Sequence, residues 1–162
     1  MSDKKKILRL FHYGLFILTS RGNGQTEPAP YAASTVTWVS QASFEPPLIM
    51  IALRKESWAN EAVRQSGIFT LNLVGKNKKE MAGKFFKEIR IVGKTINGFE
   101  FTLTEKGLPV FKDAPAYIEC KTVDRSEKGD HSVIIAEVTD AKLFRDNDDL
   151  LLLRDTGWSY GG

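Results

Sequence analysis

Residues 35–57 read TVTWVSQASFEPPLIMIALRKES, and this stretch decides both the fold and the question of function. Its first half sets four hydroxyl side chains among apolar residues, and the first charge comes only at Glu45. The hydroxyls belong to Thr35, Thr37, Ser40 and Ser43. Its second half, LIMIAL, is a continuous apolar run, which is typical of a strand buried in a core. The hydroxyls either lie inside a barrel or face a polar group that is not protein.

Pro46 and Pro47 divide the stretch. Proline has no N–H group to donate to a sheet, so the pair should end one strand and start the next. We expect strands over residues 15–19, 35–43, 48–53, 68–74, 99–104, 117–123, 132–138 and 141–144, and helices over 5–11, 57–66 and 77–86. Many short strands with turns between them and few helices predict a mainly β protein, a closed antiparallel barrel with a few short helices.

Composition limits the function classes. The chain has 162 residues, 42% hydrophobic and 27% charged, which suits one soluble globular domain over residues 1–162. The net charge of +3 is too small to indicate a nucleic-acid partner. Cys120 is the only cysteine, which excludes an intrachain disulfide and fits a reducing cytoplasm. No apolar run approaches the ~18 residues of a membrane span, and the start of the chain is interpreted as folded protein rather than a signal peptide.

The chain is poor in the residues of self-sufficient catalysis. It has only two histidines and lacks the H-E-x-x-H, C-x-x-C, G-x-S-x-G and P-loop motifs, and no residue pairing marks a metal site. Such a chain either binds something or catalyses with a borrowed cofactor. A strand ends at Arg54-Lys55 and a helix begins after Ser57, so free N–H groups, the helix dipole and a hydroxyl form a candidate anion site. The alternative is an ordinary capped helix with solvated charges.

A second candidate lies at Gly129-Asp130-His131, just before a predicted strand. The simple interpretation is a turn, with glycine in the left-handed region and the Asp side chain bonding its own backbone. The functional interpretation places the His131 imidazole at the rim of a pocket, where it contacts a substrate or a ring.

From roughly Phe11 to Val138, the sequence resembles the flavin reductase-like domain, the FMN-binding split-barrel family. The hydroxyl-rich segment before the double proline and the later G-D-H strand carry most of the resemblance, since they occur in order and at suitable separation. The match extends to residues 14–19, to the F-x-x-N-like strand at residues 69–73 and to the helix at residues 81–85. The sequence of residues 38–47 is especially similar to that of the flavin reductase module of diflavin flavoproteins.

The resemblance implies a Greek-key antiparallel split β-barrel that binds FMN, with FAD as the alternative, at the interface of a homodimer. It implies cofactor contacts from Thr35, Val36, Thr37 and Trp38 at the polar edge of the ring, Gln41, Ala42 and Ser43 along the ribityl chain and phosphate, Ser57 and Asn60 at the phosphate, and Lys84, Phe86 and Tyr160 over the flavin. His131 is the candidate catalytic contact on the nicotinamide side.

The expected function is that of an NAD(P)H-dependent flavin reductase, an oxidoreductase that passes hydride from nicotinamide to flavin. Its redox partner would be a monooxygenase or another acceptor, and no nucleic acid or membrane is expected. The alternative is an FMN-binding electron-transfer protein without nicotinamide reductase activity of its own. A third hypothesis is a barrel without flavin, in which Ser57 is merely a helix cap.

Overall fold

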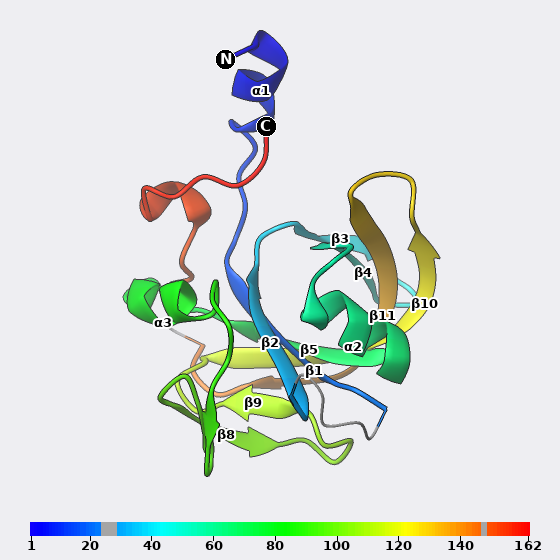
Figure 1. The fold of residues 1–162 in the computed structure, drawn as a ribbon, viewed down its shortest axis with the longest axis vertical. Coiled ribbons are helices and arrows are strands. Elements are labelled where there is room, and N and C mark those ends of the chain that lie inside the picture. The colour runs from blue at the N-terminus through cyan, green and yellow to red at the C-terminus, as the bar shows by residue number, and fades with distance from the viewer. Residues whose placement is uncertain (24–28, 147–148) are drawn as a thin grey trace.

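The computed structural model describes residues 1–23, 29–146 and 149–162. Its main element is a seven-stranded sheet in the order β2-β1-β5-β10-β11-β4-β3, in which all neighbours are antiparallel (Figure 1). The strands are β1 (Phe16–Arg21), β2 (Tyr31–Val36), β3 (Val39–Ser43), β4 (Leu48–Arg54), β5 (Ile68–Leu73), β10 (Ala116–Ser126) and β11 (His131–Leu143). A smaller sheet contains β6 (Ile91–Val92), β7 (Thr95–Ile96), β8 (Phe99–Leu103) and β9 (Pro109–Phe111). The expectation of a mainly β, antiparallel split barrel is confirmed.

The hydroxyl-rich stretch turns a corner that the sequence did not predict. The single strand expected over residues 35–43 is wrong, because β2 ends at Val36 and β3 starts at Val39. At the corner the N–H of Val39 donates to the carbonyl of Thr37 at 3.0 Å, and the N–H of Ala52 in β4 donates to the carbonyl of Trp38 at 3.0 Å. β2 and β3 are the two edge strands of the sheet, and the corner connects them. The sheet therefore curls toward a barrel, but β2 and β3 do not pair with each other. The expected closed barrel is therefore split, and the proline pair separates β3 from β4 as predicted.

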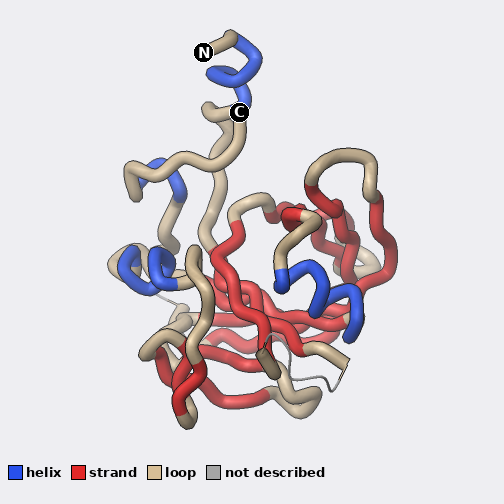
Figure 2. Tube along the Cα trace, viewed as in Figure 1, coloured by secondary structure: helices blue, strands red, loops and turns tan. Residues whose placement is uncertain are grey.

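α2 (Trp58–Ser66) lies within the curl, packed against β1, β2 and β4 (Figure 1). It begins and ends as predicted, with Ser57 as the N-cap and Gly67 in the left-handed region at φ 72°. α3 (Lys79–Lys84) is shorter than the expected 77–86. α1 (Asp3–Leu8) has no buried residue and projects from the body (Figure 2). No helix in the described ranges is long and apolar enough to cross a membrane.

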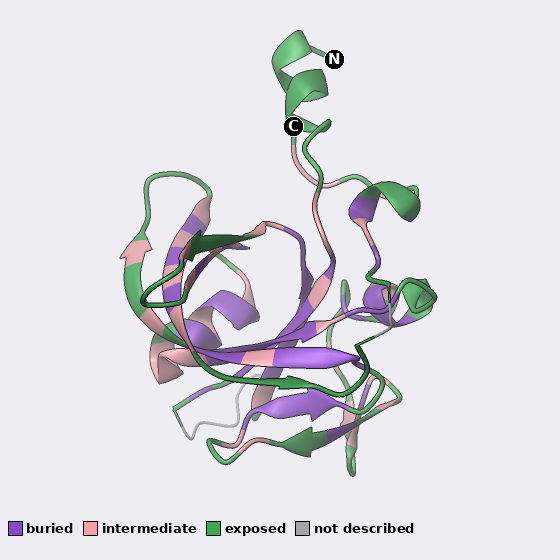
Figure 3. Ribbon diagram, turned by 180° about the vertical axis from the view of Figure 1, so that it is seen from behind, coloured by how far each residue is buried: buried purple, intermediate pink, exposed green. Residues whose placement is uncertain are grey.

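Two apolar clusters hold the sheet and its additions together. Leu18, Ile51 and Phe69 belong to the cluster inside the curl, and Ile17 and Phe85 belong to the cluster beneath α3 and the smaller sheet. Neighbouring residues of β1 thus enter different clusters, which explains why the run over residues 15–18 is continuously apolar. From behind, buried residues follow the sheet strands, whereas α1 is exposed throughout (Figure 3).

The remaining differences concern the later strands. Residues 141–144 were expected as a separate strand, but residues 141–143 continue β11, a thirteen-residue strand. Register shifts in its pairing with β10 let both strands bend with the curl. The sequence also missed β6, β7 and β9, which have only two or three residues each. So short an element leaves no periodic pattern to detect.

Candidate functional site

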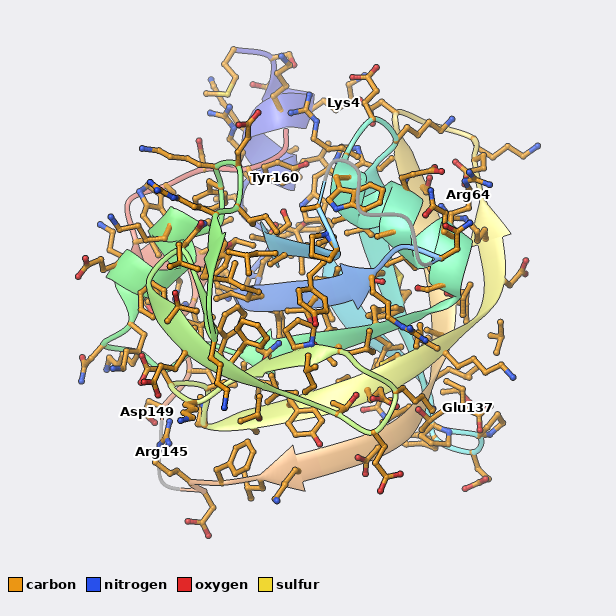
Figure 4. The ribbon with its side chains drawn as sticks, turned by 60° about the horizontal axis from the view of Figure 1, so that its bottom comes forward. Lys4, Arg64, Glu137, Arg145, Asp149 and Tyr160 are labelled. Carbon is orange, nitrogen blue, oxygen red and sulfur yellow. The ribbon has the colours of Figure 1, made fainter. Side chains whose placement is uncertain are left out.

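Three cavities meet where the corner, the end of β4 and the start of α2 come together. The inner cleft, of about 180 Å³, is lined by Ser34, Thr35, Val36, Thr37, Trp38, Ala52, Leu53, Arg54, Ser57, Ala59, Phe86 and Tyr160. The outer cavity, of about 690 Å³, shares Trp38, Arg54 and Tyr160 with it and adds His131. The side cavity, of about 360 Å³, shares Ser34, Ser57 and Ala59 with the inner cleft. Tyr160 lies at the end of the molecule that carries α1, far from Glu137 and Asp149 (Figure 4).

Two residues that line the inner cleft each carry a buried polar atom without a partner. These atoms are Oγ1 of Thr37 and Nε1 of Trp38, and neither has a hydrogen-bond partner among the described residues. Buried polar groups are nearly always hydrogen-bonded, and an unpaired one costs about 1–3 kcal/mol. The polar edge of a flavin ring fits this pair, because its carbonyl and ring-nitrogen acceptors suit an indole N–H and a hydroxyl. The donor set of the corner is therefore consistent with the cofactor that the resemblance implies.

Thr35 differs from Thr37 although both line the inner cleft. Its hydroxyl donates to the carbonyl of Ala82 at 2.7 Å, and its N–H donates to the carbonyl of Phe85 at 3.1 Å. Both bonds tie β2 to α3. Thr35 therefore shapes the cleft, and its hydroxyl proton is already in use.

The start of α2 supplies backbone donors for an anion. Oγ of Ser57 donates to the carbonyl of Arg54 at 2.9 Å and accepts from the N–H of Asn60 at 3.1 Å. The hydroxyl proton of Ser57 is therefore already used in the hydrogen bond to the carbonyl of Arg54. The N–H groups of Trp58 and Ala59 have no acceptor within the part of the chain that the structure describes. These N–H groups and the helix dipole could accommodate an anion where the inner cleft meets the side cavity, as the sequence led us to expect.

The side chain of Asn60 points into the protein. Its Nδ2 donates to Oγ of Ser132 at 2.8 Å and to the carbonyl of Arg54 at 3.3 Å, and its Oδ1 accepts from Arg125. Oγ of Ser132 donates to Glu127 at 2.6 Å, and Glu127 is paired with Arg125 at 3.2 Å. We call Asn60, Ser132, Glu127 and Arg125 the Asn60 ring. The Ser132 hydrogen bond is the largest influence that lowers the pKa of Glu127, so this carboxylate is charged. Both the nitrogen and the oxygen of the Asn60 amide are thus hydrogen-bonded within the protein, and Asn60 connects the start of α2 to β10 and β11.

An aromatic cluster separates the inner cleft from the outer cavity. The Trp38 ring lies 4.5 Å from the His131 ring and 5.1 Å from the Tyr160 ring, measured between centroids. His131 contacts Tyr160 Oη through Nε2 at 2.6 Å and Asp130 through Nδ1 at 2.7 Å. Hydrogen bonding to His131 lowers the pKa of Asp130, and burial raises that of Tyr160. An ionised carboxylate only accepts, so Nδ1 of His131 donates to Asp130.

The segment around Tyr160 is packed closely enough to require glycine. A Cβ on Gly161, at φ 99°, would lie 2.9 Å from the Trp38 ring. The carbonyl of Gly161 accepts from Nε of Arg9 at 3.1 Å. Trp158 stacks edge-on against Phe86 at 5.2 Å between centroids. Of this segment, Tyr160 lines the inner cleft, and Gly161 and Gly162 line the outer cavity.

The structure gathers only part of the predicted set. The predicted residues that line the inner cleft are Thr35, Val36, Thr37, Trp38, Ser57, Phe86 and Tyr160, and His131 lines the outer cavity. Gln41, Ala42 and Ser43 lie along edge strand β3, outside the inner cleft, and Nε2 of Gln41 donates to the carbonyl of Ser43 at 3.3 Å. Lys84 is exposed at the end of α3.

The sequence assigned no role to Arg54, which lines both the inner cleft and the outer cavity. Within the described ranges its guanidinium makes no hydrogen bond or ion pair, although its carbonyl accepts from Ser57 and Asn60. A usable signal was present, because a cation that ends a strand directly before a capped helix lies beside the helix N-terminus.

Comparisons with known proteins match most of the chain. The family described as "Flavin reductase like domain" matches residues 8–159. Diflavin flavoprotein A 1 of Synechocystis sp. is 29% identical over 143 residues, which are 88% of this chain and 24% of that protein. The chain therefore spans about a quarter of that relative's length.

Two further matches cover most of this chain and most of the matched protein. Ferric-chelate reductase (NAD(P)H) of Archaeoglobus fulgidus is 29% identical over 136 residues, covering 83% of this chain and 78% of its own. The solved structure of flavin reductase HpaC complexed with NADP⁺ superposes with a TM-score of 0.75 at 26% identity, covering 97% of this chain and 94% of that one.

Proposed function

The chain belongs to the flavin reductase-like domain family, and on that premise we propose that it is a flavin-binding oxidoreductase that passes hydride from NAD(P)H to a flavin. The observation that carries the proposal is that two residues lining the inner cleft, Thr37 and Trp38, each hold a buried polar atom, Oγ1 and Nε1, without a hydrogen-bond partner among the described residues. The relatives named as reductases support the same reaction class.

The residues of the chain would hold the cofactor at its two ends. Thr37 and Trp38 donate to the polar edge of the ring, and the N–H groups of Trp58 and Ala59 bind the phosphate. The bound flavin supplies hydride chemistry that no side chain of this protein offers. Hydrogen bonds to the ring edge stabilise negative charge on the reduced form. Val36, Phe86 and Tyr160 exclude water from the cleft.

The outer cavity is the proposed site of the pyridine nucleotide. Its volume of about 690 Å³ lies in the ~300–1,000 Å³ range of ligand pockets, and it meets the inner cleft at Trp38, Arg54 and Tyr160. Arg54 and Lys55 offer positive charge to phosphates. Asp130 holds the His131 ring in one orientation at the cavity wall. This second cavity favours a reductase over an electron carrier without nicotinamide activity.

The finer expectations form part of the proposal. We propose residues 1–162 as one flavin-binding domain in a homodimer, because Ile7, Leu10 and Phe11 on the projecting N-terminal arm are 56%, 72% and 57% exposed and a second copy would cover them. A cytoplasmic location and delivery of reduced flavin to a monooxygenase or another acceptor complete the proposal. The FMN expected from the sequence shares the ring, ribityl chain and first phosphate with FAD, so the contacts named so far suit both.

The test is flavin binding followed by turnover. We expect the purified protein to bind flavin, measured by calorimetry, and to oxidise NADH or NADPH when flavin is in excess, measured by the loss of nicotinamide absorbance. Flavin binding without oxidation of either nucleotide would favour the electron carrier. Absence of flavin binding would overturn the proposal entirely.

A further inference from the structure

Tyr160 lies between the two cavities that the proposed reaction must connect. Hydride passes only when the reacting atoms are about 3–3.5 Å apart, so a nicotinamide in the outer cavity must reach a flavin ring in the inner cleft. Trp38, Arg54 and Tyr160 line both cavities and therefore border the passage from one to the other. Which of the three side chains gives way depends on how firmly each residue is held.

Tyr160 is the least firmly held of the three. The carbonyl of Trp38 accepts a hydrogen bond from β4 at 3.0 Å, and Arg54 is itself part of β4, where its carbonyl accepts the cap bond of α2 at 2.9 Å. We call residues 157–162 the C-terminal segment. Across the described ranges, no residue of this segment takes part in a backbone–backbone hydrogen bond, and the last such bond of the chain is donated by Thr156. The C-terminal segment can therefore move without breaking a sheet or a helix.

Side-chain contacts hold the C-terminal segment on the body of the protein. They are Trp158 with Phe86 at 5.2 Å between ring centroids, Tyr160 with His131 at 2.6 Å, and the Gly161 carbonyl with Arg9 at 3.1 Å. Gly157 and Gly161 flank the two aromatic residues at φ 77° and 99°, in the region where glycine is free to turn. The Tyr160 contact involves a group of the proposed nucleotide site, because His131 lines the outer cavity.

The Tyr160 hydroxyl occupies the ring nitrogen of His131 that a ligand would use. Nδ1 of His131 already donates to Asp130 at 2.7 Å, which leaves Nε2 as the other polar atom of the ring. Tyr160 bonds to that atom, and only 14% of the His131 side chain is exposed. A nucleotide that contacts Nε2 must therefore replace the Tyr160 hydroxyl.

We propose that Tyr160 is an intramolecular competitor of the pyridine nucleotide, which must displace the Tyr160 side chain from His131 before hydride can pass. This inference rests on the proposed function. The apparent dissociation constant of the nucleotide then equals the intrinsic one divided by the fraction of molecules in which the contact is open. One hydrogen bond of ordinary net strength favours the closed state about fivefold.

Calorimetric titration of the flavin-free protein with NAD⁺ and with NADP⁺ tests the competition without measuring turnover. Tyr160→Phe keeps the ring and loses the hydroxyl, so the dissociation constant of the nucleotide should fall about fivefold. Tyr117→Phe is the matched control, because the Tyr117 hydroxyl also contacts a polar side chain, Asp140 at 3.4 Å, but Tyr117 lines none of the three cavities. It should leave nucleotide affinity unchanged. The sign is decisive, since a tyrosine that binds the nucleotide directly would give weaker binding when its hydroxyl is removed.

Arg9→Gln loosens the C-terminal segment at its other end and does not alter His131. Loss of the 3.1 Å bond to Gly161 should lower the dissociation constant of the nucleotide about twofold. This tightening runs against electrostatics, because the variant removes a positive charge from a protein that binds an anion. Lys6→Gln removes the same charge from α1, where Lys6 contacts Asp3 at 3.8 Å, and should produce no tightening.

Displacement of Tyr160 has a direct signature in fluorine NMR. The chain has four tyrosines, and in protein labelled with 3-fluorotyrosine the signal that is missing from Tyr160→Phe belongs to Tyr160. Saturating nucleotide should move this signal toward its position in the unfolded protein, whereas the Tyr117 signal should stay in place.

The possible failures are distinct. Nucleotide binding that is unchanged or weaker in Tyr160→Phe, or a Tyr160 fluorine signal that nucleotide does not move toward the unfolded position, would overturn the competitor and leave the flavin reductase proposal standing. If neither the wild type nor any variant binds NAD⁺ or NADP⁺, both proposals are overturned.

Discussion

Thr37→Val should stabilise the flavin-free protein and weaken flavin binding. Thr37 is 5% exposed and its hydroxyl has no partner among the described residues, so the folded state carries the cost of an unpaired buried hydroxyl. Valine has the same branched shape without that group. We expect the free energy of unfolding to rise by about 1–2 kcal/mol. For a domain of this size the melting temperature rises by roughly 2–4 °C per kcal/mol.

Flavin binding should respond in the opposite direction. The variant loses the hydrogen bond to the ring edge and leaves a ring atom unpaired, so the dissociation constant should rise about 5–30-fold, equivalent to about 1–2 kcal/mol. The assays are urea unfolding of the flavin-free protein and calorimetric titration with flavin.

Thr35→Val is the matched control, because the hydroxyl of Thr35 already donates to Ala82 at 2.7 Å. It should lower the unfolding free energy by about 1–2 kcal/mol and change flavin affinity by less than about twofold. A Thr37→Val protein that is less stable than wild type without flavin, or that binds flavin equally well, would refute the reasoning.

Three further predictions concern other parts of the molecule. Asn60→Ala should lower the unfolding free energy by about 3 kcal/mol, because the Arg125 guanidinium loses a buried partner; a loss under about 1 kcal/mol in urea unfolding would contradict the bracing role. Tyr160→Phe removes the 2.6 Å contact with His131, and amide exchange at residues 158–161 should become about fivefold faster, whereas unchanged exchange would mean that this segment is held elsewhere. Burial raises the pKa of the Cys120 thiol from 9.0 to about 12, so unfolding, which restores the lower value, becomes easier as the pH rises above 9.0. Native protein should resist iodoacetamide at mildly alkaline pH, whereas unfolded protein should react. If mass spectrometry detects alkylated Cys120 in the native protein, the thiol is not buried as described.

Local signals in the sequence predicted those parts of the fold that depend on local physics. The cap at Ser57 and the stop at Gly67 were correct because both act within a few residues of the helix end. The corner at Thr37 and Trp38 was not predicted, because it depends on hydrogen bonds to a strand that comes later in the chain. The alternation of apolar and polar residues along a strand does not reveal where that strand stops pairing with the neighbouring strand.

The candidate site shows the same division. The sequence placed Thr37, Trp38 and Tyr160 together through resemblance, and they line one cleft. It also placed Asn60 at the phosphate, whereas the amide of Asn60 bonds side chains 65 and 72 residues away. The direction of one side chain on a helix depends on which partners the folded sheet brings beneath it. That information is absent from the residues next to Asn60 in the sequence.

The Asn60 ring connects the two ends of the proposed reaction. Asn60 holds the carbonyl of Arg54 at the start of α2, and its partner Ser132 directly follows His131 in β11. We therefore expect an anion bound at the helix start to affect the strand that carries His131. Such coupling is reciprocal, since the factor by which flavin alters nucleotide affinity must equal the factor by which nucleotide alters flavin affinity. We therefore expect the dissociation constant of flavin to change when the nucleotide is bound, and the Asn60 ring is the part of the scaffold that would carry this effect.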